Sequence, residues 1–172
     1  MSCCDRRIVL AALLLGLGGC GFHPLYAENS PLGYDPALAA VEVRPVPDRL
    51  GQILVATVRD QLNPHGTQLK PRYVLNIGMN VARNDLGIRR DNTSTRGELT
   101  LDASLTLNVA GSNAIVYQDK VRTITSFNRP DDAYAATVAA DNASELAAAD
   151  LGREIAQRVA VYLRGKRGGA GT

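Results

Sequence analysis

The chain has 172 residues, a length that suits one domain. Its formal net charge is only +2, so no overall basic excess points to a nucleic-acid partner. The three cysteines, Cys3, Cys4 and Cys20, all lie near the N-terminus. The rest of the chain can therefore form neither a disulfide framework nor a cysteine metal site.

The N-terminus has the parts of a secretory signal peptide. Arg6 and Arg7 supply positive charge, an apolar run follows over residues 8–17, and small residues end it. The run is too short to cross a bilayer, which needs about 20 apolar residues. We therefore predict that residues 1–19 are a signal peptide that is removed.

Cys20 follows in the sequence Leu17-Gly18-Gly19-Cys20, which resembles the bacterial lipobox. In that motif the cysteine is acylated before the signal is cut, and each buried CH₂ contributes roughly 0.8 kcal/mol to membrane binding. The alternative is an ordinary signal followed by a chance cysteine. We predict that Cys20 is the lipid-anchored N-terminus. Gly21 favours the outer membrane, because aspartate at that position commonly retains lipoproteins at the inner membrane.

Residues 20–39 are rich in proline and glycine and lack periodicity, so they are predicted to form a flexible tether. Val41 and Val43 alternate with polar residues, which predicts a short edge strand over 40–46 that prolines close. Apolar residues at helical spacing predict a helix over 49–62, with Asp48 as its N-cap. Pro64 and Gly66 should end it.

The next three segments alternate between apolar and polar residues, which is typical of half-buried antiparallel strands. They cover residues 73–81, 97–109 and 115–127, and a short turn at 110–113 predicts a hairpin between the last two. In the third segment Asp119 interrupts the apolar face. The residues predicted to face the core are Tyr73, Leu75, Ile77, Met79, Val81, Gly97, Leu99, Leu101, Ala103, Leu105, Leu107, Val109, Ile115, Tyr117, Val121 and Phe127.

A last helix is predicted over 131–164, opened by Pro130 and acidic residues. The sequence leaves open whether it is continuous or broken near Asn142 or Gly152. Residues 165–172 are predicted to be a disordered tail. The predicted body, residues 40–164, is an α+β two-layer sandwich in the order β-α-β-β-β-α, with two helices on one face of a mostly antiparallel four-stranded sheet.

Catalytic and metal-binding patterns are missing from the sequence. His23 and His65 lie on the tether and in a turn, and there is no nucleophile elbow, Walker loop or dinucleotide-binding glycine pattern. Asp131 and Asp132 follow Pro130, where helix capping explains them better than acid–base chemistry. We therefore expect no enzyme activity, no cofactor and no metal.

Two groups of cations are candidates for binding an anionic ligand. Arginine binds phosphate or carboxylate through two parallel hydrogen bonds. For the loop group, a solvated hairpin tip with partly cancelled charge is the alternative; for the strand group it is cross-strand ion pairing with Glu98 and Asp102. The candidates are Arg83, Arg89, Arg90 and Arg96 around the loop between the first two long strands, and Lys120 and Arg122 on the third.

The start of the mature chain, Cys20-Gly21-Phe22-His23-Pro24-Leu25-Tyr26, resembles that of the LptE family of lipopolysaccharide-assembly lipoproteins, in the form typical of alphaproteobacteria. The order of the predicted elements also fits this family. Cys20 is the only residue whose role can be carried over from the family, because it alone matches a family motif. The six cations therefore remain candidates inferred from this sequence alone.

The resemblance implies two helices on a four-stranded sheet, a non-enzymatic role, and a position as a plug inside the outer-membrane β-barrel LptD. It also implies help with barrel assembly and with delivery of lipopolysaccharide to the outer leaflet. The expected partners are LptD in a heterodimer, lipopolysaccharide, and the outer membrane through the lipid, with no nucleic acid. An auxiliary lipoprotein of an ABC-type lipid transporter is the alternative.

Overall fold

The computed structural model describes residues 35–88, 94–112 and 114–168. The elements, in chain order, are α2 (Pro36–Ala39), β1 (Val41–Val43), α3 (Arg49–Leu62), β2 (Tyr73–Ile88), β3 (Ser94–Val109), β4 (Ile115–Asn128) and α4 (Ala133–Gly168). The predicted signal peptide, Cys20 and most of the predicted tether lie outside the described residues. No helix among the described residues has the length and apolarity needed to cross a bilayer.

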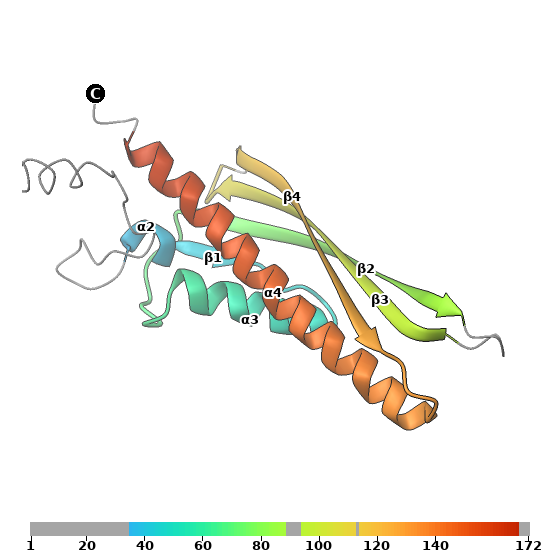
Figure 1. Ribbon diagram of the computed structural model, residues 1–172. Helices are drawn as coiled ribbons and strands as arrows, with labels where there is room; N and C mark the ends of the chain where they lie inside the picture. Colours follow the sequence, from blue (N-terminus) through green and yellow to red (C-terminus); the bar gives the residue numbers. More distant parts are fainter. Residues whose placement is uncertain (1–34, 89–93, 113, 169–172) are drawn as a thin grey trace, which may run out of the picture.

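The strands form one sheet in the order β1-β2-β3-β4. β1 runs parallel to β2, and the β2–β3 and β3–β4 pairs are antiparallel. Among the described elements, helices α3 and α4 cover one face of this sheet, and none covers the other face (Figure 1). The predicted α+β two-layer architecture is confirmed, with β1 at the sheet edge and the short helix α2 added before it.

The core lies between the helices and the inner face of the sheet. β3 contributes most to it, because every second residue points inward. Leu99, Leu101, Leu105 and Leu107 are fully buried, and Leu54, Leu151 and Ile155 of the helices are buried with them. The predicted core face of β3 is thus confirmed from Gly97 to Leu107.

The start of β4 differs from the prediction. Leu107 lies opposite Tyr117, but Asn108 lies opposite Ile115, so Val116 is an extra residue in β4. This bulge shifts the alternation by one position. Val116 packs against the core, and Ile115, predicted to face the core, is 56% exposed.

The helix boundaries bring three corrections. Asp48 precedes α3 as predicted, but its φ of 73° is far from the extended conformation of an N-cap, and its side chain makes no capping hydrogen bond. α4 continues through Asn142 and Gly152 to Gly168, four residues beyond the predicted end at 164. α2 lies within the predicted tether, yet its Leu38 is buried in the core.

Gly152 shows why α4 is continuous at a residue that disfavours helix. A Cβ atom there would lie 3.0 Å from the backbone oxygen of Leu54 and 3.0 Å from Cβ of Thr57, both on α3. The missing side chain lets α3 and α4 approach closely. Packing between the two helices therefore outweighs the roughly 1 kcal/mol by which glycine disfavours a helix relative to alanine.

Candidate binding surfaces

The sheet separates the predicted cations onto its two sides. Arg83 of β2 lies opposite Leu99, whose side chain is in the core, so Arg83 belongs to the inner face. Arg96, Lys120 and Arg122 alternate with core residues of β3 and β4 and so belong to the outer face. Arg89 and Arg90 lie outside the described residues. The cations that can be placed therefore do not form a single cluster.

On the outer face, Arg122 is bound to Asp102 of β3. Its Nε lies 2.6 Å and its Nη2 3.3 Å from the two carboxylate oxygens. The hydrogen bonds that Arg122 donates to this carboxylate raise the pKa of Arg122. Cross-strand ion pairing, the alternative weighed for Lys120 and Arg122, thus holds for Arg122.

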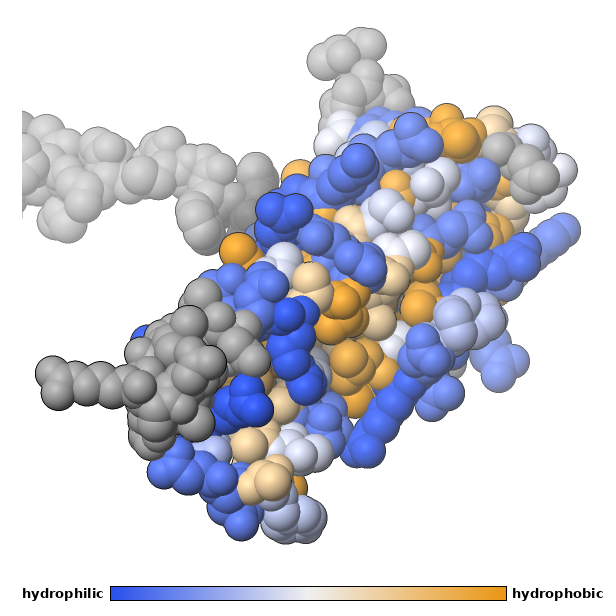
Figure 2. Space-filling model, turned by 90° about the vertical axis from the view of Figure 1, so that its right-hand side faces the viewer, coloured by the Kyte–Doolittle hydropathy of each residue, from blue (hydrophilic) through white to orange (hydrophobic). Residues whose placement is uncertain are grey.

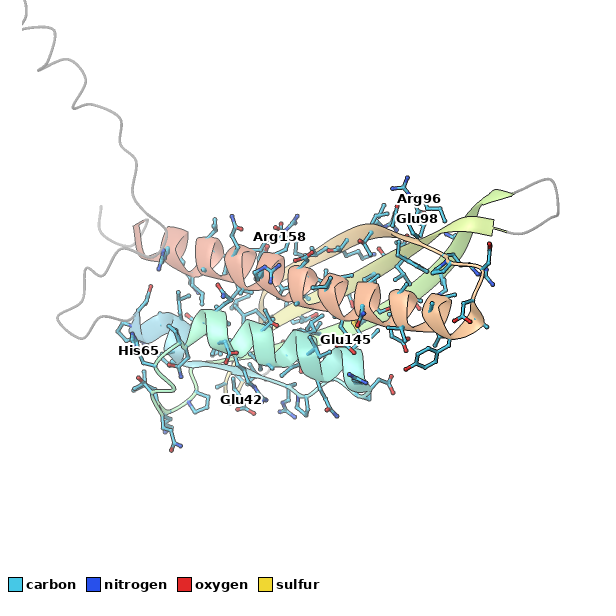
Figure 3. The ribbon with its side chains drawn as sticks, turned by 60° about the horizontal axis from the view of Figure 1, so that its bottom comes forward. Glu42, His65, Arg96, Glu98, Glu145 and Arg158 are labelled. Carbon is cyan, nitrogen blue, oxygen red and sulfur yellow. The ribbon has the colours of Figure 1, made fainter. Side chains whose placement is uncertain are left out.

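The other two outer-face cations, Arg96 and Lys120, differ from Arg122. Lys120 lies opposite Ser104 and not opposite an acidic residue, and its side chain is exposed. Arg96 lies near Glu98 on the distal part of the sheet, away from α3 (Figure 3), and it has an interaction partner. Lys120 is therefore the outer-face candidate best placed to meet an anion.

The outer face is a mostly polar surface across β2, β3 and β4, interrupted by two exposed apolar residues of β4, Ile115 and Ile124. Small and polar side chains alternate outward along all three long strands. Asn76 of β2 donates to Asn108 of β3 over 3.3 Å, and the Ser104 hydroxyl donates to the Gly78 carbonyl over 3.4 Å. Its members include Asn76, Gly78, Asn80, Glu98, Thr100, Asp102, Ser104, Thr106, Asn108, Gln118, Lys120 and Arg122.

The half of the inner face farther from β1 carries exposed apolar side chains. Seen from the end of the molecule at which β2 and β3 project, an apolar strip runs between hydrophilic side chains (Figure 2). Val81 of β2 is 40% exposed although it was predicted to face the core, and Val138 of α4 is 38% exposed. Arg83 lies two residues beyond Val81 on the same side of β2. Exposed apolar surface and a cation therefore occur together at this end.

Asp119 occupies a core-facing position of β4, opposite Leu105, and it is paired rather than free. Its Oδ2 accepts from Nη1 of Arg158 on α4 and from the hydroxyl of Tyr117, both over 2.8 Å. Arg158 also donates to Glu154 over 2.8 Å. Figure 3 shows Arg158 on α4.

These contacts shift the acid–base properties of the cluster. The hydrogen bond from Arg158, together with that from Tyr117, lowers the pKa of Asp119. Partial burial and the neighbouring Asp119 raise the pKa of Tyr117. The Tyr117 ring stacks on Tyr162 of α4 at a centroid distance of 4.6 Å, and the Tyr162 hydroxyl donates to the Val116 carbonyl over 2.6 Å. The cluster joins α4 to β4.

Sequence reasoning noted Asp119 only as an interruption of an apolar face. A carboxylate at an inward position is itself a signal, since buried charges are normally paired. The partner could not be read from the sequence, because α4 carries several arginines. The described part of the chain holds no group of three or more His, Cys, Asp or Glu side chains placed to bind a metal.

Comparison with known proteins places this architecture among bacterial lipoproteins. No protein-family model and no curated protein matches the sequence. Among solved structures, a putative lipoprotein of Caulobacter crescentus is 27% identical with a TM-score of 0.61, covering 76% of this chain and 94% of its own. The rare lipoprotein B of Shewanella oneidensis is 14% identical with a TM-score of 0.57, covering 74% of this chain and 96% of its own.

A minor lipoprotein of Acinetobacter baumannii has the same fold at 14% identity, with a TM-score of 0.55 and coverage of 70% and 88%. The chain therefore has a fold that occurs in bacterial lipoproteins, with two helices on one face of the sheet. Among these lipoproteins, the structure is similar to rare lipoprotein B and to the Caulobacter protein over nearly their full lengths.

Proposed function

We propose that this chain is an outer-membrane lipoprotein, anchored through Cys20, that lies in the lumen of the lipopolysaccharide-translocating β-barrel LptD. In this role it assists assembly of the barrel and helps deliver lipopolysaccharide to the outer leaflet. The Cys20–Tyr26 sequence supports placing it with the alphaproteobacterial LptE proteins. The role is structural and ligand-binding, not enzymatic.

The uncovered polar face of the sheet is the observation that carries this proposal. A sheet face with no layer upon it must meet water or a partner. Here it is lined mainly by hydroxyl, amide and charged groups, such as Asn76 with Asn108 and Asp102 with Arg122. Such a face suits the water-filled, polar interior of a large barrel, whereas an apolar face would suit a further protein layer.

The part of the inner face that lies farther from β1 supports the part of the proposal that concerns lipopolysaccharide. A lipid with phosphates and acyl chains requires cations beside apolar surface. Arg83 lies two residues from the exposed Val81 on the same side of β2, with Val138 also exposed on α4. On the outer face, Lys120 is a further cation exposed to an approaching ligand.

Depletion of the protein in its native cell tests the function. Lipopolysaccharide at the cell surface should fall, as measured by labelling intact cells, and a plasmid copy of the wild-type chain should restore it. A Cys20→Ala form carrying a cleavable export signal separates anchoring from the role of the folded body. Unchanged surface lipopolysaccharide with altered phospholipid asymmetry would instead favour the auxiliary lipoprotein of an ABC-type lipid transporter.

A further inference from the structure

Among the described residues, nothing pairs with one edge of β2 over most of its length. β2 has 16 residues, but β1 pairs only with its first part, at Tyr73, Val74 and Leu75. Figure 1 shows β2 continuing well beyond the end of β1. Among the described residues, no strand pairs with this side of β2 after Leu75. We call the stretch from Ile77 to Arg83 the open edge.

The hydrogen bonds at the start of β2 show which backbone groups point to the open edge. Leu75 accepts from the backbone N–H of Arg44 on the β1 side, over 3.0 Å, whereas Arg72 accepts from Ala110 on the β3 side, over 3.0 Å. Because successive residues of a strand alternate in direction, odd-numbered residues of β2 present their N–H and C=O groups away from β3. At the open edge these residues are Ile77, Met79, Val81 and Arg83.

The same residues direct their side chains to the inner face. Ile77 and Met79 are partly buried, and Val81 is 40% exposed. At the open edge, therefore, backbone donors and acceptors that pair with no described strand occur beside apolar side chains that are only partly covered. Between Asn76 and Ala82 it carries no proline and no charged residue.

The opposite edge of the sheet is different. The residues of β4 that point their backbone outward are the even-numbered ones, because the odd ones pair with β3. These include Lys120 and Arg122, and charged residues at an edge disfavour pairing with another strand. β1, at its own edge, is followed by Pro45 and Pro47, which lack the N–H needed for a ladder. Among the edges described, the stretch of β2 from Ile77 to Ala82 lacks such protection, and the charged Arg83 follows it.

We propose that the open edge of β2 binds an extended segment of the barrel partner as an added strand. The proposal rests on the function proposed above. Backbone hydrogen bonds to Ile77, Met79 and Val81 would provide binding, as in other cases of strand addition. Alternate apolar residues of the segment would cover the exposed side chain of Val81 and contact the apolar strip.

A second copy of the chain fits the open edge less well. Two antiparallel copies of β2 paired about Asn80, the middle of the open edge, would place residues 85–87 of one copy opposite Leu75, Val74 and Tyr73 of the other. β1 already occupies that position, because Val43 pairs with Leu75. An isolated extended segment meets no such obstacle, since it can begin beyond the end of β1.

Amide hydrogen exchange, resolved to single residues by mass spectrometry, tests the proposal on the full acylated chain, alone and in the complex purified from outer membranes. In the isolated chain the amides of Met79 and Val81 should exchange fast, while those of Asn80 and Ala82, bonded to β3, exchange slowly. In the complex, Met79 and Val81 should slow at least about tenfold. Lys120 and Arg122 serve as internal controls on the other edge.

Two substitutions extend this test. Val81→Pro removes an outward N–H without removing a bond to β3, and Val81→Lys keeps the backbone but adds a charge to the edge. Each should lower the amount of barrel recovered per chain about tenfold. Val161→Lys, at an exposed apolar position of α4, is the matched control and should leave recovery unchanged. If Val81→Pro does not fold, the result for Val81→Lys alone decides whether the open edge binds the barrel.

The outcomes separate this proposal from the function on which it rests. A barrel that co-purifies while Met79 and Val81 still exchange fast would overturn the open-edge proposal alone. Failure to recover any barrel would overturn both. Protection of Met79 and Val81 already present in the isolated chain would also overturn the open-edge proposal. In that case a dimer mass by light scattering would show that a second copy covers the edge. A monomer mass would show that another segment of the same chain covers it.

Discussion

Arg158 of α4 and Asp119 of β4 form an ion pair across the two layers, with 2.8 Å between Nη1 and Oδ2. Asp119 is the charged residue on the inner face of β4, and Arg158 comes from the helix that covers it. Because both side chains are partly shielded, at 40% and 27% exposure, this pair should matter more than the exposed pairs elsewhere on α4.

A double-mutant cycle of Asp119→Ala and Arg158→Ala should give a coupling free energy of about 0.5–1 kcal/mol in urea unfolding. The exposed pair formed by Asp150 and Arg153 on α4 is the control. Its cycle should give a smaller value, since solvent screens it more. Equal couplings in the two cycles would show that partial burial adds nothing to the pair of Asp119 and Arg158.

The same pair should make stability sensitive to acid. The pKa of Asp119 is lowered in the folded state by its bonds from Arg158 and Tyr117. Its contribution is therefore complete above the unfolded-state pKa of about 3.9 and is lost as pH falls through the lower, folded-state value. As the pH falls below about 5, Asp119→Asn should lose less stability than the wild type. Parallel curves for the two proteins would contradict this.

Gly152 should tolerate no large side chain. Gly152→Leu places atoms where α3 already lies, 3.0 Å from the Leu54 oxygen, and should destabilise the protein by about 1–3 kcal/mol. Gly165→Leu, at a position of α4 with nothing within 4 Å, should be neutral or stabilising, because leucine favours a helix. Thermal and urea unfolding of the two variants measure the difference.

The cations should differ in their effect on lipopolysaccharide binding. Arg122 already binds Asp102, whereas Arg83 and Lys120 are exposed. Arg83→Glu should therefore weaken binding of purified lipopolysaccharide by about tenfold, a loss typical of one charged hydrogen-bonded contact. Arg122→Gln should change it little. The double variant Arg89→Asp with Arg90→Asp should also weaken binding while the protein stays folded. A larger loss for Arg122→Gln than for Arg83→Glu would assign binding to the outer face.

The regular parts of the fold could be predicted from sequence because their patterns depend on local periodicity. Strict alternation over residues 97–109 fixed which side chains of β3 face the core, and helical spacing gave α3 its observed bounds. The bulge at Val116 could not be predicted, because both neighbouring residues, Ile115 and Val116, are apolar and either could face inward. Gly152 could not be interpreted without the helix that packs on it.

The candidate site was predictable only in part. The alternation of β2 places Arg83 on the side of Val81, but exposure of Val81 depends on how far α3 extends over the sheet. The pairing of Arg122 with Asp102 follows from the β3–β4 register, which the turn at 110–113 did not determine alone. The open edge of β2 depends on the short length of β1, which was predicted over 40–46 but ends at Val43.

The partner of the chain can be identified by purifying the acylated chain from native outer membranes and analysing what remains bound after solubilisation by mass spectrometry. We predict a stoichiometric complex with a single large outer-membrane β-barrel protein of the LptD type, and loss of that barrel from the membrane when the chain is depleted. Recovery of the chain as a monomer, or bound to an inner-membrane permease, with the barrel at its normal level after depletion, would show that the chain is not a partner of the barrel.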